Sequence, residues 1–212
     1  MADLGSLTDN ELFDAWLRGD ARAAAELFER HYDAIERFFR NKVIEGYDDL
    51  VQQTFAACLE GRDRFRGESS FRTYLFAIAN NILRVHFRTR KRDQERLEWT
   101  EVSAMDLAPG PSTMFRAQRE QQLLLDALRR IPLDYQVVLE LFYWEELPAS
   151  AIAEVVGKVE NTVRSRLRKG RQLLEKKLQA LASSQEEFER TCQDLDRWAR
   201  SIHREHEDRA QA

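Results

Sequence analysis

The stretch that most constrains the fold is residues 147–181, "LPASAIAEVVGKVENTVRSRLRKGRQLLEKKLQAL". Its apolar residues recur at three- or four-residue steps, which is the spacing of one face of an α-helix. Gly157 interrupts the pattern where a helix would end in a left-handed turn. Asn161 and Thr162 follow as candidate N-caps of a second helix. The stretch therefore predicts two short helices joined by a tight turn.

The second of these helices has one apolar face and one basic face. Val163, Leu167 and Leu174 share one side. The opposite side is polar and basic, and Arg164 and Arg166 stand at its shoulders. An α-helix fits the DNA major groove, where Arg and Lys contact phosphates and guanine edges and Ser and Asn reach bases. Two interpretations stay open. One is a helix-turn-helix that reads DNA, which the turn, the glycine and the basic face together favour. The other is an amphipathic helix with a solvated basic face. The candidate DNA-binding residues are Asn161, Arg164, Ser165, Arg168 and Lys169.

The composition favours helix along the whole chain. Of 212 residues, 33% are charged, and there are only 8 Gly and 4 Pro, so few residues break helices. The formal net charge is −4, and the argument for nucleic acid therefore rests on the local distribution of charge.

The cysteines and the hydropathy pattern predict a cytoplasmic protein. Cys58 and Cys192 lie far apart in sequence and lack the spacing of metal ligands, which predicts a reduced protein without a disulfide framework. No apolar run approaches the ~20 residues that a membrane span needs, and the first residues lack the apolar core of a signal peptide. We expect no membrane span, no metal and no cofactor.

Periodic apolar residues predict a helical bundle at the start of the chain. We expect two helices within 7–42, the first opened by a capping box of Thr8 and Glu11, and a third helix over 48–64. The outer face of the third helix is polar and acidic. An ordinary solvated face explains it as well as a binding surface does. The residues of interest on that face are Asp49, Gln52 and Gln53.

A fourth helix, expected over 71–92, carries residue types that suit single-stranded nucleic acid. Bases stack on aromatic rings, amides read flipped-out bases, and cations follow phosphates. The alternative, which the sequence weights evenly, is that Phe76 and Phe87 pack on a neighbouring helix. We predict a core face of Phe71, Leu75, Ile78, Ile82 and Val85. The predicted outer face holds Thr73, Phe76, Asn80, Arg84 and Phe87, flanked by Tyr74, Asn81 and Arg88.

A change of composition over 93–114 marks a linker. Acidic residues outnumber basic ones there, the apolar periodicity ends, and Pro109-Gly110-Pro111 excludes a continuous helix. Residues 115–144 return to helical periodicity, which gives the two-helix unit of 147–181 a surface to pack on.

The last 30 residues read as an amphipathic tail. Phe188 and Cys192 begin an apolar stripe among charges of both signs, which predicts a helix that docks on this protein or on a partner. A metal site of Cys192, His203 and His206 is disfavoured, because about three helical turns separate the cysteine from the histidines.

The predicted fold class is all-α. It comprises two small helical domains, an N-terminal helical bundle and a C-terminal helix-turn-helix unit, joined by a flexible linker and followed by a C-terminal helical tail. The expected domains are residues 1–92, the acidic linker 93–114, the helix-turn-helix domain 115–182 and the extension 183–212.

Three motifs, in this order, resemble bacterial RNA polymerase sigma factors, and most of all their small extracytoplasmic-function (ECF) branch. They are "DDLVQQTF" from Asp48, "FRGESSFRTYLFAIANN" from Phe65 and "LPASAIAEVVGKVENTVRSRLRKGR" from Leu147. The resemblance covers roughly residues 7–181. One departure is Pro148, which stands where the family usually has a capping Ser, so we expect the side-chain cap of that helix to be lost.

The resemblance implies a role for each helix. The helix over 49–60 would dock on the clamp helices of the polymerase β′ subunit through Asp49, Gln52 and Gln53. The helix over 160–174 would read the duplex −35 element with the candidate residues named above. The helix over 71–92 would melt and capture the −10 element, with Asn81 beside the pocket for a flipped base. The expected −10 residues are Tyr74, Asn80, Asn81, Arg84 and Arg88.

The function that the resemblance implies is transcription initiation. Such a protein binds core RNA polymerase, recognises the −10 and −35 promoter elements and opens the promoter. It is not an enzyme, and the sequence offers no nucleophile–base pair or P-loop. An anti-sigma factor is a further partner that the resemblance suggests, and regulation by the C-terminal extension is the alternative to it. Two other functions stay open: a stand-alone helix-turn-helix regulator, and an interaction protein whose basic faces bind an acidic partner.

Overall fold

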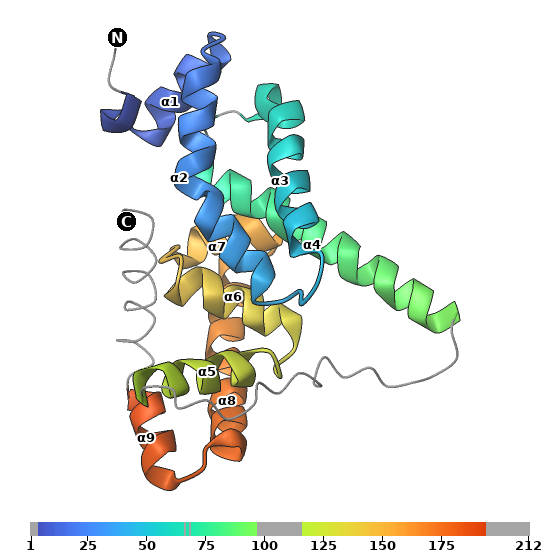
Figure 1. The fold of residues 1–212 in the computed structure, drawn as a ribbon, viewed down its shortest axis with the longest axis vertical. Coiled ribbons are helices and arrows are strands. Elements are labelled where there is room, and N and C mark those ends of the chain that lie inside the picture. Colours follow the sequence, from blue (N-terminus) through green and yellow to red (C-terminus); the bar gives the residue numbers. More distant parts are fainter. Residues whose placement is uncertain (1–3, 66, 68, 97–115, 194–212) are drawn as a thin grey trace. The chain divides into compact units, whose positions relative to one another are not determined.

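The computed structural model describes residues 4–65, 67, 69–96 and 116–193 (Figure 1). These residues form helices and their connections, and no strand occurs among them, so the expected all-α fold class is confirmed. The helices pack as two compact units. The first unit holds the residues as far as Thr89 together with Leu147–Glu160, and the second holds the rest.

The first unit is built mainly from the N-terminal helices. The sequence predicted each of them, with ends that differ by a few residues. A short 3-10 helix precedes α1 at Leu4–Ser6, and another, Arg62–Arg64, follows α3. The α-helices are α1 (Asp9–Leu17), α2 (Ala21–Arg40), α3 (Tyr47–Gly61), α4 (Phe71–Arg96) and α7 (Ala149–Val156).

Local sequence signals set the starts of the first three helices. The predicted capping box is present: the Glu11 backbone N–H donates to Thr8 Oγ1 at 3.4 Å, and the Thr8 backbone N–H donates to Glu11 Oε2 at 2.8 Å. Asp20 caps α2 by accepting from the Arg22 backbone N–H at 2.9 Å. Gly46, with φ 75°, turns the chain into α3, a conformation that favours glycine.

An aromatic cluster joins α1 to α4 in the core of the first unit. The ring of Phe13 lies 4.7 Å from that of Phe65 and 5.7 Å from that of Phe71, centroid to centroid. Trp16 packs edge-on against Phe13 and Phe28, at 5.4 and 5.5 Å. Aromatic pairs at these separations bury large areas and add about 0.5–1.5 kcal/mol each beyond that burial.

A polar network ties the start of α1 to α2 and to the first turn of α4. His31 Nε2 lies 2.7 Å from Asp9 Oδ2, and the His31 ring packs 5.5 Å from that of Phe71. Arg30 Nη1 lies 3.5 Å from Asp9 Oδ1. The hydrogen bond from His31 and the nearby charges of His31 and Arg30 lower the pKa of Asp9 although partial burial opposes them. Asp9 is therefore held as a carboxylate.

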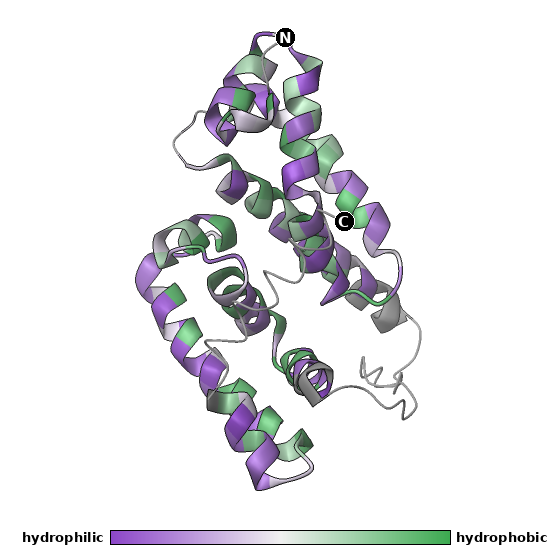
Figure 2. Cartoon of the chain, turned by 60° about the vertical axis from the view of Figure 1, so that its left-hand side comes forward, coloured by the Kyte–Doolittle hydropathy of each residue, from purple (hydrophilic) through white to green (hydrophobic). Residues whose placement is uncertain are grey.

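The second unit contains α5 (Arg116–Leu128), α6 (Leu133–Tyr143), α8 (Glu160–Leu181) and α9 (Gln185–Gln193). The boundary between the units falls after Glu160, the first residue of α8. Along each helix hydrophobic and hydrophilic residues are interleaved (Figure 2), as amphipathic packing requires.

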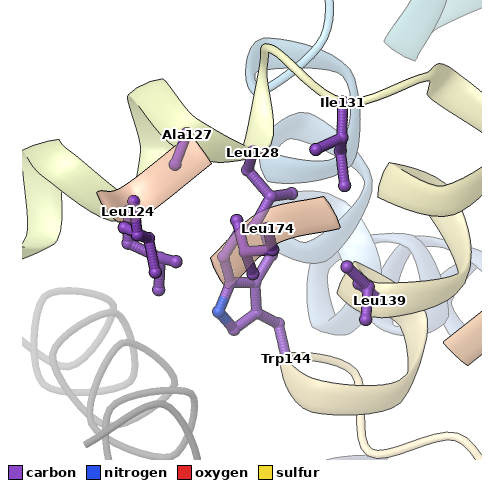
Figure 3. Packing of buried hydrophobic residues seen from close by; sticks show 8 residues of the cluster. Leu124, Ala127, Leu128, Ile131, Leu139, Trp144 and Leu174 are labelled. Atoms are coloured by element: carbon purple, nitrogen blue, oxygen red, sulfur yellow. The ribbon is translucent and has the colours of Figure 1, made fainter. Parts of the chain in front are cut away.

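The core of the second unit is a cluster of aliphatic side chains around Trp144. Leu128, Leu174 and Trp144 point toward one another (Figure 3) and are at most 4% exposed. Phe188 and Cys192 of α9 pack against this cluster as partly buried residues. Arg119 Nε of α5 donates to Glu187 Oε1 of α9 at 2.8 Å. The predicted amphipathic tail therefore begins, over α9, as a helix that docks on its own chain.

The predicted domain boundaries agree only partly with these packing units. The sequence assigns α7 to the C-terminal domain, whereas α7 groups by contacts with the N-terminal helices. Most of the predicted linker, residues 97–114, and the rest of the tail, with His203 and His206, lie outside the described residues. Within the described ranges no helix is both long and apolar enough to span a membrane.

Candidate nucleic-acid interface

Helix α8 presents all five predicted −35 residues to solvent. Its opposite side is buried through Val163, Gly170, Leu174 and Leu178. Of the three residues predicted for the apolar side, Val163 and Leu174 are buried and Leu167 is half-buried. The exposed residues are Asn161, Arg164, Ser165, Arg168 and Lys169. Their side chains have the donors that phosphates and guanine edges accept.

A close approach of α8 to α6 fixes which face of α8 turns outward. A Cβ placed on Gly170 would lie 3.2 Å from Leu139 Cδ1 and 3.3 Å from Tyr135 Cβ. These distances are shorter than ordinary contacts between carbon atoms, so a larger residue would require Leu139 and Tyr135 to shift by a few tenths of an ångström. Gly170 therefore lets α8 lie directly on α6, with the basic row on the far side.

Two arginines at the edges of the basic face contact protein acceptors. Arg166 Nη2 donates to Asp134 Oδ2, in the first turn of α6, at 2.8 Å. On the other edge, Arg171 makes long contacts of 3.4 Å with Tyr143 Oη and Glu175 Oε1. Both flanks of α8 thus have acceptors from the protein itself.

The turn between the two predicted helices has the expected geometry. Gly157 ends α7 in the left-handed conformation at φ 64° and ψ 45°, and the loss of a side-chain cap at Pro148 is observed. Helix α8 begins at Glu160. Asn161 and Thr162 therefore lie inside its first turn, and their predicted role as N-caps was wrong.

Helix α4 is rotated relative to the sequence prediction. Phe76 is 1% exposed and packs edge-on against Phe38, with centroids 5.7 Å apart. Thr73 is buried as well, whereas Val85, predicted to face the core, is 48% exposed. The prediction that Phe76 lies on the outer face was wrong, and the alternative that it packs on a neighbouring helix is confirmed. The reason is that α4 meets partners on several sides, which its own periodicity does not reveal.

Two predicted −10 residues are engaged inside the first unit. Asn80 is 6% exposed, and its Nδ2 donates to the Val155 carbonyl oxygen of α7 at 3.1 Å. The Tyr74 hydroxyl donates to the Gly61 carbonyl oxygen at 3.1 Å. Asn80 is therefore buried and the Tyr74 hydroxyl is bonded within the unit, contrary to the prediction of an open binding face.

The other three predicted −10 residues share one exposed stripe of α4. Asn81, Arg84 and Arg88 are exposed, and Val85 lies among them. Their spacing of three and four residues places them on one side of the helix. The structure thus brings together an amide and two guanidinium groups beside an apolar side chain. The amide can bond to a base edge and the guanidinium groups to phosphates.

The third predicted face, on α3, is exposed and has apolar neighbours that the sequence did not indicate. Asp49, Gln52 and Gln53 are exposed. Leu59, one turn from the partly buried Phe55, is 48% exposed. The Phe55 ring stacks on that of Tyr32 at 6.0 Å and 7°, and Tyr32 is 45% exposed. An exposed apolar residue has the same helical spacing as a buried one, so no signal in the sequence identifies Tyr32 and Leu59 as surface residues.

Two family models match the chain. The model for sigma-70 region 2 matches residues 27–93, and the model for sigma-70 region 4 matches residues 121–174. The first match contains the α3 face and the α4 stripe, and the second contains the basic row of α8. Together the matches cover more than half of the chain, and α9 lies beyond them.

Curated relatives match at low identity over most of the chain. An ECF RNA polymerase sigma-E factor of Haemophilus influenzae is 26% identical over 184 residues, which covers 82% of this chain and 97% of the relative. The protein of the same name from Escherichia coli strain K12 is 25% identical over 184 residues, with coverage of 82% and 96%.

Solved structures support the same fold. CnrH, in complex with the cytosolic domain of CnrY, matches with a TM-score of 0.60 at 24% identity, over 82% of this chain and 99% of that one. RpoE of Bartonella quintana, solved with the anti-sigma factor NepR, matches with a TM-score of 0.58 at 22% identity, over 72% and 94%.

Proposed function

The chain belongs to the sigma-70 family of RNA polymerase sigma factors, and on this premise we propose that it is a non-catalytic ECF-type initiation factor that grips promoter DNA at two points. It binds core RNA polymerase, recognises the −35 and −10 elements and opens the promoter. The observation that carries the proposal is the presence of two different nucleic-acid faces on one chain: the basic row of α8 and the mixed stripe of α4.

Helix α8 acts on duplex DNA at the −35 element. Its outward row combines three basic residues with Asn161 and Ser165, and a helix of this kind places such side chains against base edges and phosphates in the major groove. Arg168 and Lys169 lie at the centre and one edge of that row. They supply the salt-dependent part of the affinity.

Helix α4 acts on the opened −10 strand through its exposed stripe. Asn81 supplies an amide for the edge of a flipped base, and Arg84 and Arg88 follow the phosphates. Tyr74 and Asn80 remain in the proposed −10 set in a different role. Their polar groups already donate to the carbonyl oxygens of Gly61 and Val155. In this role they hold α4 in place and do not contact DNA themselves while those hydrogen bonds are formed.

The face of α3 is the proposed contact with core polymerase. Asp49, Gln52 and Gln53 provide its polar part, and the exposed Leu59 and Tyr32 provide apolar surface beside it. Apolar residues with a polar rim are typical of specific protein interfaces. The proposed partner surface is the clamp-helix region of the polymerase β′ subunit.

An anti-sigma factor is a further proposed partner. A structural relative, RpoE, is solved with the anti-sigma factor NepR. For this chain the proposal predicts that a co-expressed anti-sigma protein prevents its binding to core polymerase. Regulation by the extension beyond Ser183 remains the competing proposal.

Run-off transcription with core polymerase tests the function. Initiation from a promoter only when this chain is added supports a sigma factor. Specific duplex binding without initiation would instead indicate a stand-alone helix-turn-helix regulator. Binding of neither DNA nor polymerase would leave an interaction protein as the better account.

A further inference from the structure

The ion pair between Arg166 and Asp134 lies at the edge of the proposed DNA-reading face. At about 100° per residue, Arg166 is displaced by roughly 60° around α8 from Lys169. A helix seated in the major groove turns its flanks toward the sugar–phosphate walls, where Arg side chains commonly bind. Arg166 therefore has the position and the chemistry of a phosphate ligand, yet its guanidinium donates to Asp134 Oδ2 at 2.8 Å.

We propose that Asp134 limits the sequence-independent part of DNA affinity, because its carboxylate occupies Arg166 and so keeps one phosphate contact from forming. The inference rests on the proposed role of α8 as the −35 reader. A carboxylate and a phosphate offer a guanidinium the same kind of charged oxygen acceptors. Asp134 stands in for the phosphate, and only one of the two acceptors can hold the same N–H groups at a time.

Solvent screening at Asp134 limits what the ion pair adds to folding. The Asp134 side chain is 60% exposed, whereas that of Arg166 is 22% exposed, and an ion pair with one exposed partner contributes little to stability. The close contact at Gly170 and the buried apolar row already hold α8 on α6. The ion pair does fix the position of the Arg166 guanidinium beside the proposed DNA-reading face.

That placement matters because phosphate contacts raise affinity for every sequence alike. Each phosphate neutralised adds about 0.9 to the slope of log K against log salt concentration, whatever the bases. An additional such contact would strengthen binding to unrelated duplex as much as to the −35 element. Arg171 on the other flank also has protein acceptors, Tyr143 and Glu175, so the two flanks follow one pattern.

The test compares binding of holoenzyme, reconstituted from the full chain and core polymerase, to −35 duplex and to scrambled duplex over a salt series. Asp134→Asn should tighten binding to both duplexes alike, by about 3- to 10-fold, and steepen each salt slope by about 0.9. Arg166→Ala should stay within about twofold of wild type, because Arg166 does not reach a phosphate in the wild-type protein. Asp134→Glu keeps a carboxylate and should behave as wild type.

The double variant Asp134→Asn with Arg166→Ala separates this inference from simple repulsion of DNA by Asp134. If Arg166 mediates the effect, the double variant behaves as Arg166→Ala alone. Persistence of the tighter binding in the double variant would overturn the proposal, as would a flatter salt slope for Arg166→Ala alone or no change for Asp134→Asn.

A second reference variant keeps failure of this inference distinct from failure of the proposed function. Arg168→Ala with Lys169→Ala should weaken −35 binding and flatten the salt slope if α8 is the reader. If that variant behaves as wild type, α8 is not the reader, and the role of Asp134 falls with it. If that variant is impaired while Asp134→Asn is silent, only the role of Asp134 is overturned.

Discussion

Helices α4 and α8 both carry arginines beside an apolar face, yet the sequence predicted the orientation of only one of them. In α8 all five predicted contact residues are exposed. In α4 the predicted outer residues Phe76 and Asn80 are buried, and the predicted core residue Val85 is exposed. The difference lies in how many sides of each helix are apolar.

Helix α8 has a single apolar row, so the spacing of its apolar residues allows only one rotation of the helix about its axis. Helix α4 instead has apolar residues almost all the way round in its first three turns, including Phe71, Leu75, Phe76 and Ile78. A helix of this kind packs on several neighbours, and those neighbours decide its rotation. The lesson is that periodicity orients a helix only where one face is clearly polar.

The largest expected effect tests the rotation of α4. Phe76→Ala should lower the free energy of unfolding by about 3–5 kcal/mol, because it empties a fully buried site against Phe38. Val85→Ala is the matched control on the exposed side, and should change it by no more than about 0.5 kcal/mol. Urea-induced unfolding of the full chain measures both. A larger loss of stability for Val85→Ala than for Phe76→Ala would instead support the orientation of α4 that the periodicity predicted.

The next effect concerns the core that supports α8. Phe188→Ala should lower the free energy of unfolding by about 1–3 kcal/mol, less than for a fully buried Phe because Phe188 is partly exposed. Glu189→Ala, at an exposed position of the same helix, should be nearly neutral. Equal effects of the two variants would mean that α9 does not dock on the second unit.

This result also bears on the regulatory hypothesis for the extension. Truncation after Ala182 removes both α9 and the rest of the tail, so a loss of activity could come from a weakened core. Phe188→Ala isolates the core contribution. If truncation changes regulation beyond what Phe188→Ala does, the tail regulates. If truncation leaves activity and its regulation untouched, the regulatory hypothesis is removed.

A smaller effect tests the exposed stripe of α4. Asn81→Ala should reduce promoter opening by roughly tenfold at unchanged duplex binding, since one buried hydrogen bond to a base contributes about 1–2 kcal/mol. Permanganate reactivity of the −10 strand reports opening, and a mobility shift reports binding. Equal loss of both would contradict a role for Asn81 at a flipped base.

The smallest effect tests how the start of α4 is held. Asp9→Asn should lower the free energy of unfolding by about 1 kcal/mol or less at pH 7, because Asp9 is partly exposed to solvent. The pKa of Asp9 is lowered in the folded state from its ordinary value of 3.8. Its contribution is therefore complete above pH 3.8 and is lost as the pH falls through the folded pKa. Urea-induced unfolding of the wild type and of Asp9→Asn at pH 7 and near pH 3 measures this contribution. A difference in the free energy of unfolding that grows toward low pH would contradict the lowered pKa of Asp9.

Much of the fold could be read from local signals. The capping box of Thr8 and Glu11 and the left-handed Gly157 are set by residues within one turn, and both were predicted. The hydrogen bond of Asn80 to Val155 spans 75 residues, and the ion pair of Arg166 with Asp134 spans 32. Such pairs depend on how helices pack, so no local pattern announces them.

The candidate site divides in the same way. The exposed rows of α8 and α3 follow from polar residues at helical spacing. The apolar surface of Tyr32 and Leu59 was missed, because an exposed apolar residue has the same spacing as a buried one. The roles assigned to all three faces remain predictions.

The most direct test of the two-point grip is promoter opening measured against holoenzyme concentration for two variants. We predict that Arg168→Ala with Lys169→Ala shifts the curve to higher concentration and reaches the wild-type plateau, because α8 supplies only duplex affinity. We predict that Asn81→Ala saturates at the wild-type concentration with a plateau roughly tenfold lower. If both variants shift the curve in the same way, or both lower the plateau, the division of labour between α8 and α4 is wrong.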